Sequence, residues 1–125
     1  MFVIDGHCDV LYKLFEQPQL DFYAAGLNGL DVTYPRLEQG NVKVQFFAIY
    51  LPERITVPQF DHYLEYVSIF NRKIVADPRM QAIRTKADLD AVIKGPRRGA
   101  LLTLEGADAL HGNSLHLKTL YELGV

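Results

Sequence analysis

The stretch that decides the fold lies at residues 2–9 and reads Phe-Val-Ile-Asp-Gly-His-Cys-Asp. Three apolar residues, two of them β-branched, run directly into a polar cluster, which predicts a short buried strand with a polar carboxyl end. Because side chains alternate along a strand, we expect His7 and Asp9 on one side and Cys8 on the other. An imidazole beside a carboxylate suits a divalent metal ion such as zinc.

The same residues also allow a simpler interpretation. A His-x-Asp pair occurs by chance in many chains, and Asp5-Gly6 is a common turn dipeptide. Asp5 is then either a partner that orients His7 or the acceptor of a turn hydrogen bond. Cys8 is the single cysteine of the chain, so no intrachain disulfide forms. We expect it to pack as a small hydrophobic side chain, since a nucleophilic cysteine needs a nearby base.

Length and composition limit the class of protein. The chain has 125 residues, 49% hydrophobic and 22% charged, which predicts one globular domain or part of one. The net charge of −2 and the scattered Lys and Arg residues, apart from Arg97-Arg98, argue against a nucleic-acid partner. No signal peptide precedes the first strand, and no apolar run is long enough for a membrane helix, so we expect a soluble, cytoplasmic protein. The final Gly124-Val125 resembles the entry to another strand, and we expect a fragment.

Two more stretches are predicted to be principal strands. Residues 43–51 are almost continuously apolar and aromatic, as expected of a strand covered on both faces, and Pro52 ends them. Residues 99–105 read Gly-Ala-Leu-Leu-Thr-Leu-Glu and form the third. Helical patterns separate the strands, and this alternation predicts an α/β fold with parallel strands and right-handed crossovers.

The remaining elements are predicted from periodicity and capping residues. Thr33 and Thr85 are expected to cap helices, and Asp88 stands in the position of a capping-box acid. The long helix should bury a stripe that includes Phe60, Leu64 and Val67. The predicted helices span residues 10–15, 34–39, 58–76, 85–94 and 115–123, with a short extended piece at 80–84 and a loop at 19–31.

Glu105 ends the third strand as His7 and Asp9 end the first. Because the carboxyl ends of parallel strands lie along one edge, these three side chains are expected to converge despite their separation in sequence. A carboxylate between two divalent ions can bridge them. From spacing alone, a salt bridge at the strand end explains Glu105 equally well.

Several segments resemble the renal (membrane) dipeptidase family of zinc metallopeptidases, which have a TIM-like barrel of the amidohydrolase group. Residues 5–9 resemble the opening Asp-Gly-His-Asn-Asp motif of that family, with Cys8 in place of Asn. Residues 37–50, with Gly-Asn-Val at 40–42, resemble its second-strand block, and Leu-Glu-Gly at 104–106 resembles its Glu-Gly motif. Residues 113–125 resemble the helix that follows. The segments occur in order along nearly the whole chain.

The resemblance implies a function and a site. His7 and Asp9 would ligate one zinc ion, and Glu105 would bridge it to a second and act in catalysis. A metal-bridging hydroxide would hydrolyse the peptide bond of a dipeptide. The chain, residues 1–125, would be the N-terminal portion of a single barrel domain, with about three of its eight strands. Two further histidine ligands would come from later strands, so this fragment would be inactive. We expect membrane attachment not to carry over, since the 125 residues include no signal or anchor segment.

Two alternatives remain open at this point. Another amidohydrolase, acting on a cyclic amide or ester, is one; many of those begin with His-x-His, and Asp9 favours the dipeptidase. The other is a non-catalytic fragment that binds metal weakly or pairs with another chain, a homodimer included, to cover its open strand edges. His62, His111 and His116 are expected to be ordinary packing or surface residues.

Overall fold

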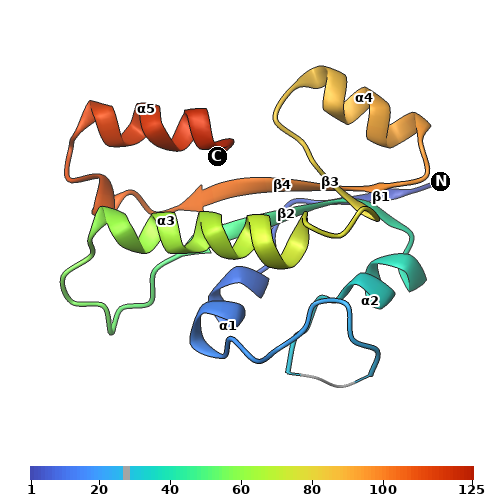
Figure 1. Ribbon diagram of the computed structural model, residues 1–125, viewed down its shortest axis with the longest axis horizontal. Coiled ribbons are helices and arrows are strands. Elements are labelled where there is room, and N and C mark those ends of the chain that lie inside the picture. The colour runs from blue at the N-terminus through green and yellow to red at the C-terminus, as the bar shows by residue number, and fades with distance from the viewer. Residues whose placement is uncertain (27–28) are drawn as a thin grey trace.

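The computed structural model describes residues 1–26 and 29–125, and it contains one sheet flanked by helices (Figure 1). Within the described residues the sheet has four strands in the order β1-β2-β4-β3, and each neighbouring pair is parallel. The strands are β1 (Val3–Asp5), β2 (Val42–Tyr50), β3 (Met80–Ala82) and β4 (Arg98–Glu105). The helices are α1 (Val10–Glu16), α2 (Tyr34–Gln39), α3 (Phe60–Ile69), η1 (Phe70–Ile74), α4 (Lys86–Lys94), η2 (Asp108–Leu110) and α5 (Ser114–Leu123).

The register of the central strands brings their carboxyl ends to one edge. β2 pairs with β4 from Val44 opposite Gly99 to Tyr50 opposite Glu105. β1 pairs with the first half of β2, up to Asp5 opposite Gln45. The parallel α/β fold predicted from the sequence is therefore what the structure shows.

The main core lies between one face of the sheet and helices α1 and α3. Phe47 of β2 is fully buried there, and its ring makes edge contacts with Phe22 and Phe70 at centroid distances of 5.6 and 5.8 Å. Phe15 of α1 stacks on Tyr66 of α3 at 5.0 Å. Aromatic rings thus fill most of the space between these helices and the sheet.

Helix α4 covers the opposite face of the sheet. Val44, which alternates with Phe47 along β2, packs with Ile83 and Val92 in a second buried cluster. In Figure 1, α4 lies above the strands, while α1 and α2 lie below them. A Cβ atom at Gly99 of β4 would come within 2.4 Å of Ile83 Cδ1, so the close approach of this cluster to β4 requires glycine.

The predicted caps are confirmed. The Thr33 side chain accepts a hydrogen bond from the Arg36 amide at the start of α2. At α4, Thr85 and Asp88 form the reciprocal capping box, with Asp88 Oδ2 accepting from the Thr85 amide at 2.9 Å. These signals are local in sequence, which is why they could be predicted without knowledge of the tertiary structure.

One prediction about the strands is wrong. The first strand is not buried, since Phe2, Val3 and Ile4 are 44%, 47% and 51% exposed. β1 lies at the edge of the sheet and pairs only with β2, so its apolar side chains lack a cover within the described residues. The loop predicted at 19–31 includes residues 27 and 28, which lie outside the described residues.

The long helix also differs from its prediction. It begins at Phe60, changes from α-helix to π-helix at Phe70 and ends at Ile74. Leu64, predicted to be buried, is 36% exposed, whereas Tyr66 is fully buried. The rings of Tyr66 and Phe70 pack on Phe15 and Phe47, which turns Leu64 away from the sheet.

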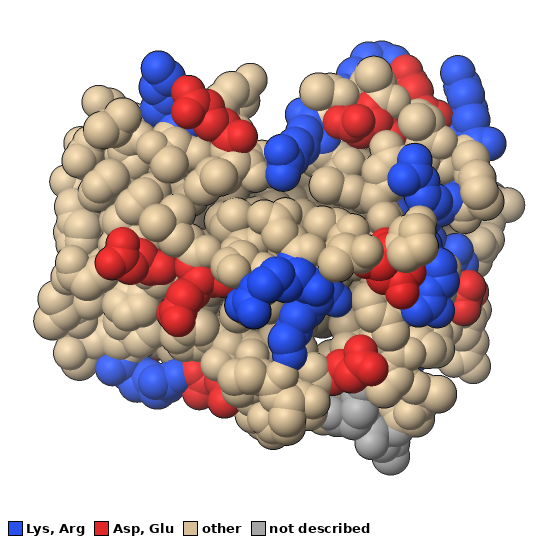
Figure 2. All heavy atoms as spheres, viewed as in Figure 1, with Lys and Arg blue, Asp and Glu red and all other residues tan. Residues whose placement is uncertain are grey.

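Charged side chains of both signs are interspersed over the face drawn in Figure 2. The arrangement agrees with a net charge of −2. Within the described residues, no helix has the length and apolar character needed to cross a membrane.

Arg79, in the segment before β3, packs its guanidinium on two aromatic rings, one in α2 and one in the loop before it. Arg79 lies 4.6 Å from the ring centroids of Tyr23 and Tyr34 and donates two side-chain hydrogen bonds to Asp77, at 2.9 and 2.8 Å. These hydrogen bonds, with one from the Arg79 amide, lower the pKa of Asp77 to about 2. The ion pair therefore orients the guanidinium, whose contacts with the two rings hold the start of β3 against α2 and the loop before it.

This depressed pKa predicts a pH-dependent stability. Because the folded state binds a proton at Asp77 less readily than the unfolded state, the carboxylate stabilises the fold above about pH 4, and that contribution disappears as the pH falls toward 2. Asp77→Asn should lower the free energy of unfolding at pH 7 and have a clearly smaller effect near pH 2.5, as measured by urea denaturation at both pH values. Glu53→Gln, at an exposed position, is the control with a small effect at pH 7. An Asp77→Asn effect that is equal at the two pH values would contradict the assignment.

Candidate metal centre

The segment after β1 places His7 through one hydrogen bond to a side chain and one between backbone groups. The carboxylate of Asp5 accepts the His7 amide at 3.2 Å, and the Cys8 carbonyl accepts the amide of Ala48 in β2 at 3.1 Å. Asp5 therefore serves the turn, one of the two roles considered from the sequence. Since β1 ends at Asp5, His7 and Asp9 follow the strand rather than forming part of it.

Asp9 stands at the N-terminal cap position of α1. Its carbonyl accepts the Lys13 amide at 3.1 Å, but its carboxylate makes no capping hydrogen bond. That carboxylate instead approaches His7, with Oδ1 3.3 Å from Nε2. A negative charge is favoured at this end of a helix, because the free amides of the first turn point toward it.

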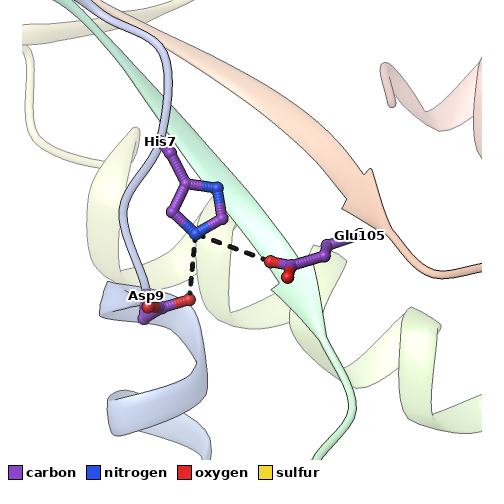
Figure 3. A group of neighbouring side chains, drawn as sticks. All are labelled: His7, Asp9 and Glu105. Carbon is purple, nitrogen blue, oxygen red and sulfur yellow. Dashed lines mark hydrogen bonds and ion pairs between the residues drawn. The ribbon is translucent and has the colours of Figure 1, made fainter.

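Glu105 is the last residue of β4 and lies opposite Tyr50 at the end of β2. Its Oε2 is 3.5 Å from Nε2 of His7. Figure 3 shows the imidazole between the two carboxylates, one from the start of α1 and one from the end of β4. The three residues thus come from two segments on either side of β2, the one between β1 and α1 and the end of β4.

The spacing of these atoms fits metal coordination. One ligand atom from each of the three residues lies within 4.8 Å of the others. Ligands bound at about 2.0–2.1 Å to a tetrahedral ion stand about 3.3 Å apart, close to the two distances measured from His7 Nε2. The side chains of His7, Asp9 and Glu105 are 53%, 51% and 50% exposed, so the donors face solvent at an open edge.

The other histidines serve the local structure. His62 Nδ1 accepts the Gln59 amide at the start of α3, and His111 Nε2 lies 2.8 Å from the Pro58 carbonyl. His116 stacks on Phe60 with ring centroids 4.1 Å apart and lies 3.1 Å from the Leu110 carbonyl. The structural roles expected for all three are what the structure shows.

The cavities of the chain do not all lie at this centre. A pocket of about 200 Å³ beside it is lined by His7, Asp9, Lys13 and Asp31, among others. A groove of about 620 Å³ lies elsewhere, between α4 and α5, where Figure 2 shows a hollow. Because the groove is lined mainly by apolar atoms and is remote from the three donors, we assign the chemistry to the smaller pocket.

The sequence does not predict one contact near Glu105. Tyr63 lies in the helix predicted at residues 58–76, where periodicity indicates packing alone, but its buried hydroxyl hydrogen-bonds to Gly106 and Ala109, just after β4. Burial raises the pKa of this hydroxyl, so it remains a neutral phenol. Periodicity identifies buried faces but not the partner of a polar atom at the tip of a ring.

Cys8 is buried among the residues of the main core, as predicted. It is 6% exposed, and burial raises the pKa of its thiol to about 12. Cys8, which stands in place of Asn in the Asp-Gly-His-Asn-Asp motif, is therefore a core residue.

This burial predicts protection of Cys8 from alkylation. Iodoacetamide at neutral pH should label the native protein at least tenfold more slowly than the same protein in urea, as followed by intact mass, because the reagent reaches the thiol only after local opening. A Glu65→Cys variant, with a thiol at an exposed position, supplies the control for rapid labelling. Equal labelling of Cys8 in the native and unfolded states would show that the segment after β1 is not packed against β2.

Comparison with known proteins gives consistent matches along the whole chain. The family model described as "Membrane dipeptidase (Peptidase family M19)" matches residues 1–125. Dipeptidase 3 of Rattus norvegicus is 28% identical over 130 residues, which cover 98% of this chain and 25% of that protein. The chain therefore spans about a quarter of the length of this curated relative.

Solved structures share the fold. The dipeptidase AC, a metallopeptidase of family M19, superposes with a TM-score of 0.78 at 23% identity, over 100% of this chain and 41% of that one. A metallopeptidase from Rhodobacter sphaeroides, solved with a phosphinate mimic of the dipeptide L-Ala-D-Ala, gives a TM-score of 0.74 at 22% identity, over 100% and 44%. The arrangement of parallel strands and helices in this chain is thus part of a larger known fold.

Proposed function

Because the chain belongs to the membrane dipeptidase family, peptidase family M19, as the resemblance predicted, we propose that it carries part of the metal centre of a zinc-dependent dipeptidase. The convergence of His7, Asp9 and Glu105 at one edge of the sheet is the observation that supports this function. One imidazole and two carboxylates are a donor set suited to zinc.

Each donor has a distinct role in the proposal. His7 Nε2 and the Asp9 carboxylate hold one zinc ion. The Glu105 carboxylate, at the end of β4, would be shared between this ion and a second. When bound, zinc would supply an activated water and polarise the scissile carbonyl of the dipeptide.

The three donors do not complete a site for two ions, since each zinc ion takes about four ligands. The chain also covers 25% to 44% of the proteins it matches. We therefore propose that further ligands and the substrate-binding residues come from chain outside these 125 residues, within one barrel domain. The isolated 125-residue chain is then expected to bind zinc weakly and to lack dipeptidase activity.

Metal reconstitution of the full-length protein tests the function. Metal-free protein should hydrolyse dipeptides only after zinc is added, and His7→Ala should abolish the recovery. The control is His62→Gln, at a histidine that serves the capping box of α3, where glutamine can replace it. Turnover that persists in a chelator, or that is unchanged in His7→Ala, would refute the proposal.

The substrate class needs a separate test. Another metal hydrolase, acting on cyclic amides or esters, would use a related set of donors, and the carboxylate of Asp9 at the second position favours the dipeptidase. A panel of dipeptides of both stereochemistries, dihydropyrimidine-type cyclic amides and lactones should show turnover of the dipeptides alone. Preferential hydrolysis of a cyclic amide would transfer the assignment to the other class.

The uncovered edge strand suggests how the isolated chain behaves. Phe2, Val3 and Ile4 expose apolar surface beside an unpaired strand edge, which favours association with further chain or with a second copy. Size-exclusion chromatography during a zinc titration distinguishes a chain that associates and binds zinc weakly from a monomer that holds a complete site. A monomer that binds two zinc ions tightly would contradict the proposed need for additional ligands.

A further inference from the structure

The hydroxyl of Tyr63 joins α3 to the turn that follows Glu105. Tyr63 is 1% exposed, and its hydroxyl donates to the Gly106 carbonyl at 3.0 Å while it accepts the Ala109 amide at 3.2 Å. Gly106 lies in the turn that follows β4, and Ala109 lies in η2, the short helix that follows this turn. A single oxygen atom thus provides the hydrogen-bond partner of two backbone groups that follow Glu105, where the pairing of β4 with β2 has ended.

The carboxylate of Glu105 has little else to hold it. Across residues 1–26 and 29–125, the contact that the structure gives this carboxylate is the one with His7, at 3.5 Å. The side chain is half exposed, so few packing contacts hold it. Where the carboxylate lies therefore depends strongly on its backbone, which β2 holds through Tyr50 on one side and the turn holds on the other.

The turn itself requires support. Gly106 has a φ of +81°, a conformation that other residues rarely adopt. Without the hydrogen bonds of Tyr63, the buried Ala109 amide and the Gly106 carbonyl would lose their partner, and the turn would be free to rearrange to regain one. A rearrangement at Gly106 changes the backbone next to Glu105 first.

Helix α3 also provides an internal comparison. Tyr66, one turn further along, is as deeply buried as Tyr63, but its hydroxyl has no hydrogen-bond partner among the described residues. Both rings pack between α3 and its neighbours, so they differ in the contact made by the hydroxyl. The two positions therefore separate the effect of removing a buried hydroxyl from the effect of releasing the turn.

We propose that Tyr63 is a positioning residue that fixes the turn after β4 and thereby directs the Glu105 carboxylate toward His7. This inference rests on the proposed metal centre. It adds to that function a role for Tyr63, which would not contact the metal itself. Tyr63 would hold in place Glu105, the ligand proposed to join the two ions.

The test compares the zinc affinities of matched variants of the full-length protein, measured by competition with a chromophoric chelator below the Tm of each variant. Tyr63→Phe should weaken zinc binding roughly 10–100-fold, as is usual when a residue that orients a metal ligand is lost. Tyr66→Phe should leave the affinity unchanged. Gly106→Ala, which disturbs the same turn without altering Tyr63, should weaken binding in the same way.

A double variant shows whether the effect passes through Glu105. In a Glu105→Gln background, Tyr63→Phe should cause no further loss of affinity, whereas a general loss of folding would still add to it. If Glu105→Gln weakens binding but Tyr63→Phe behaves like Tyr66→Phe, the positioning role is refuted and the metal centre stands. If Glu105→Gln itself binds zinc like the wild type, Glu105 is not a ligand, and both the proposed centre and this inference fail.

Discussion

Replacing Glu105 by glutamine in the full-length protein is expected to lower kcat/KM for a dipeptide by about 10²–10³-fold, the loss typical for removal of one principal electrostatic contact in an active site. The amide is nearly isosteric but neutral, so it cannot contribute a negative oxygen to each of two ions. The residue is half exposed, and its carboxylate contacts His7 rather than the core, so the fold should tolerate the change. Steady-state kinetics at saturating zinc measures the effect.

The matched control is Glu122→Gln on α5, which makes the same chemical change at an exposed position paired with Lys118. It should retain the wild-type kcat/KM. Thermal unfolding of Glu105→Gln without metal should remain near that of the wild type. Unchanged kcat/KM in Glu105→Gln would remove Glu105 from the catalytic centre, even if zinc were still required.

Phe47→Ala is expected to lower the free energy of unfolding by about 3–5 kcal/mol, the usual range for removal of a fully buried phenylalanine. The ring lies on the central strand and contacts Phe22 and Phe70, which belong to segments on either side of it in sequence. The aromatic neighbours are themselves large and closely packed, so the cavity cannot close by small shifts. Urea denaturation monitored by circular dichroism measures the loss.

Leu117→Ala provides the comparison on an exposed surface. This leucine of α5 is 57% exposed, and its truncation should change the free energy of unfolding by less than about 0.5 kcal/mol. A Phe47→Ala effect as small as that of Leu117→Ala would mean that the two sides of the main core are not packed together in solution.

Local signals made much of this fold predictable. Thr33, Thr85 and Asp88 mark helix starts through hydrogen bonds within three residues, and they were expected from the sequence. The strand at residues 42–50 is also evident, because nearly every side chain is apolar. The order of the elements then limits the topology to parallel strands with crossovers.

Other features depended on the tertiary structure. A run such as Phe2-Val3-Ile4 reads as buried, but its exposure depends on which strands lie beside it, and β1 pairs with only one. Likewise, periodicity alone did not identify the side of α3 that faces the sheet. That side is set by the packing of Tyr66 on Phe15. The positions of the predicted donors, by contrast, followed from a simple rule, namely that the ends of parallel strands share an edge.

The position of β2 between β1 and β4 has a consequence for folding. The donors before α1 and at the end of β4 meet only when both flanking strands have joined β2 in the correct alignment, because a one-residue slip of β4 would send Glu105 to the opposite face. An ion captured there acts as a cross-link between the first and last parts of the chain and favours the native pairing alone. A measurement of zinc affinity would therefore also report whether the sheet is correctly assembled. It would detect molecules with misaligned strands, which circular dichroism does not distinguish from the native fold.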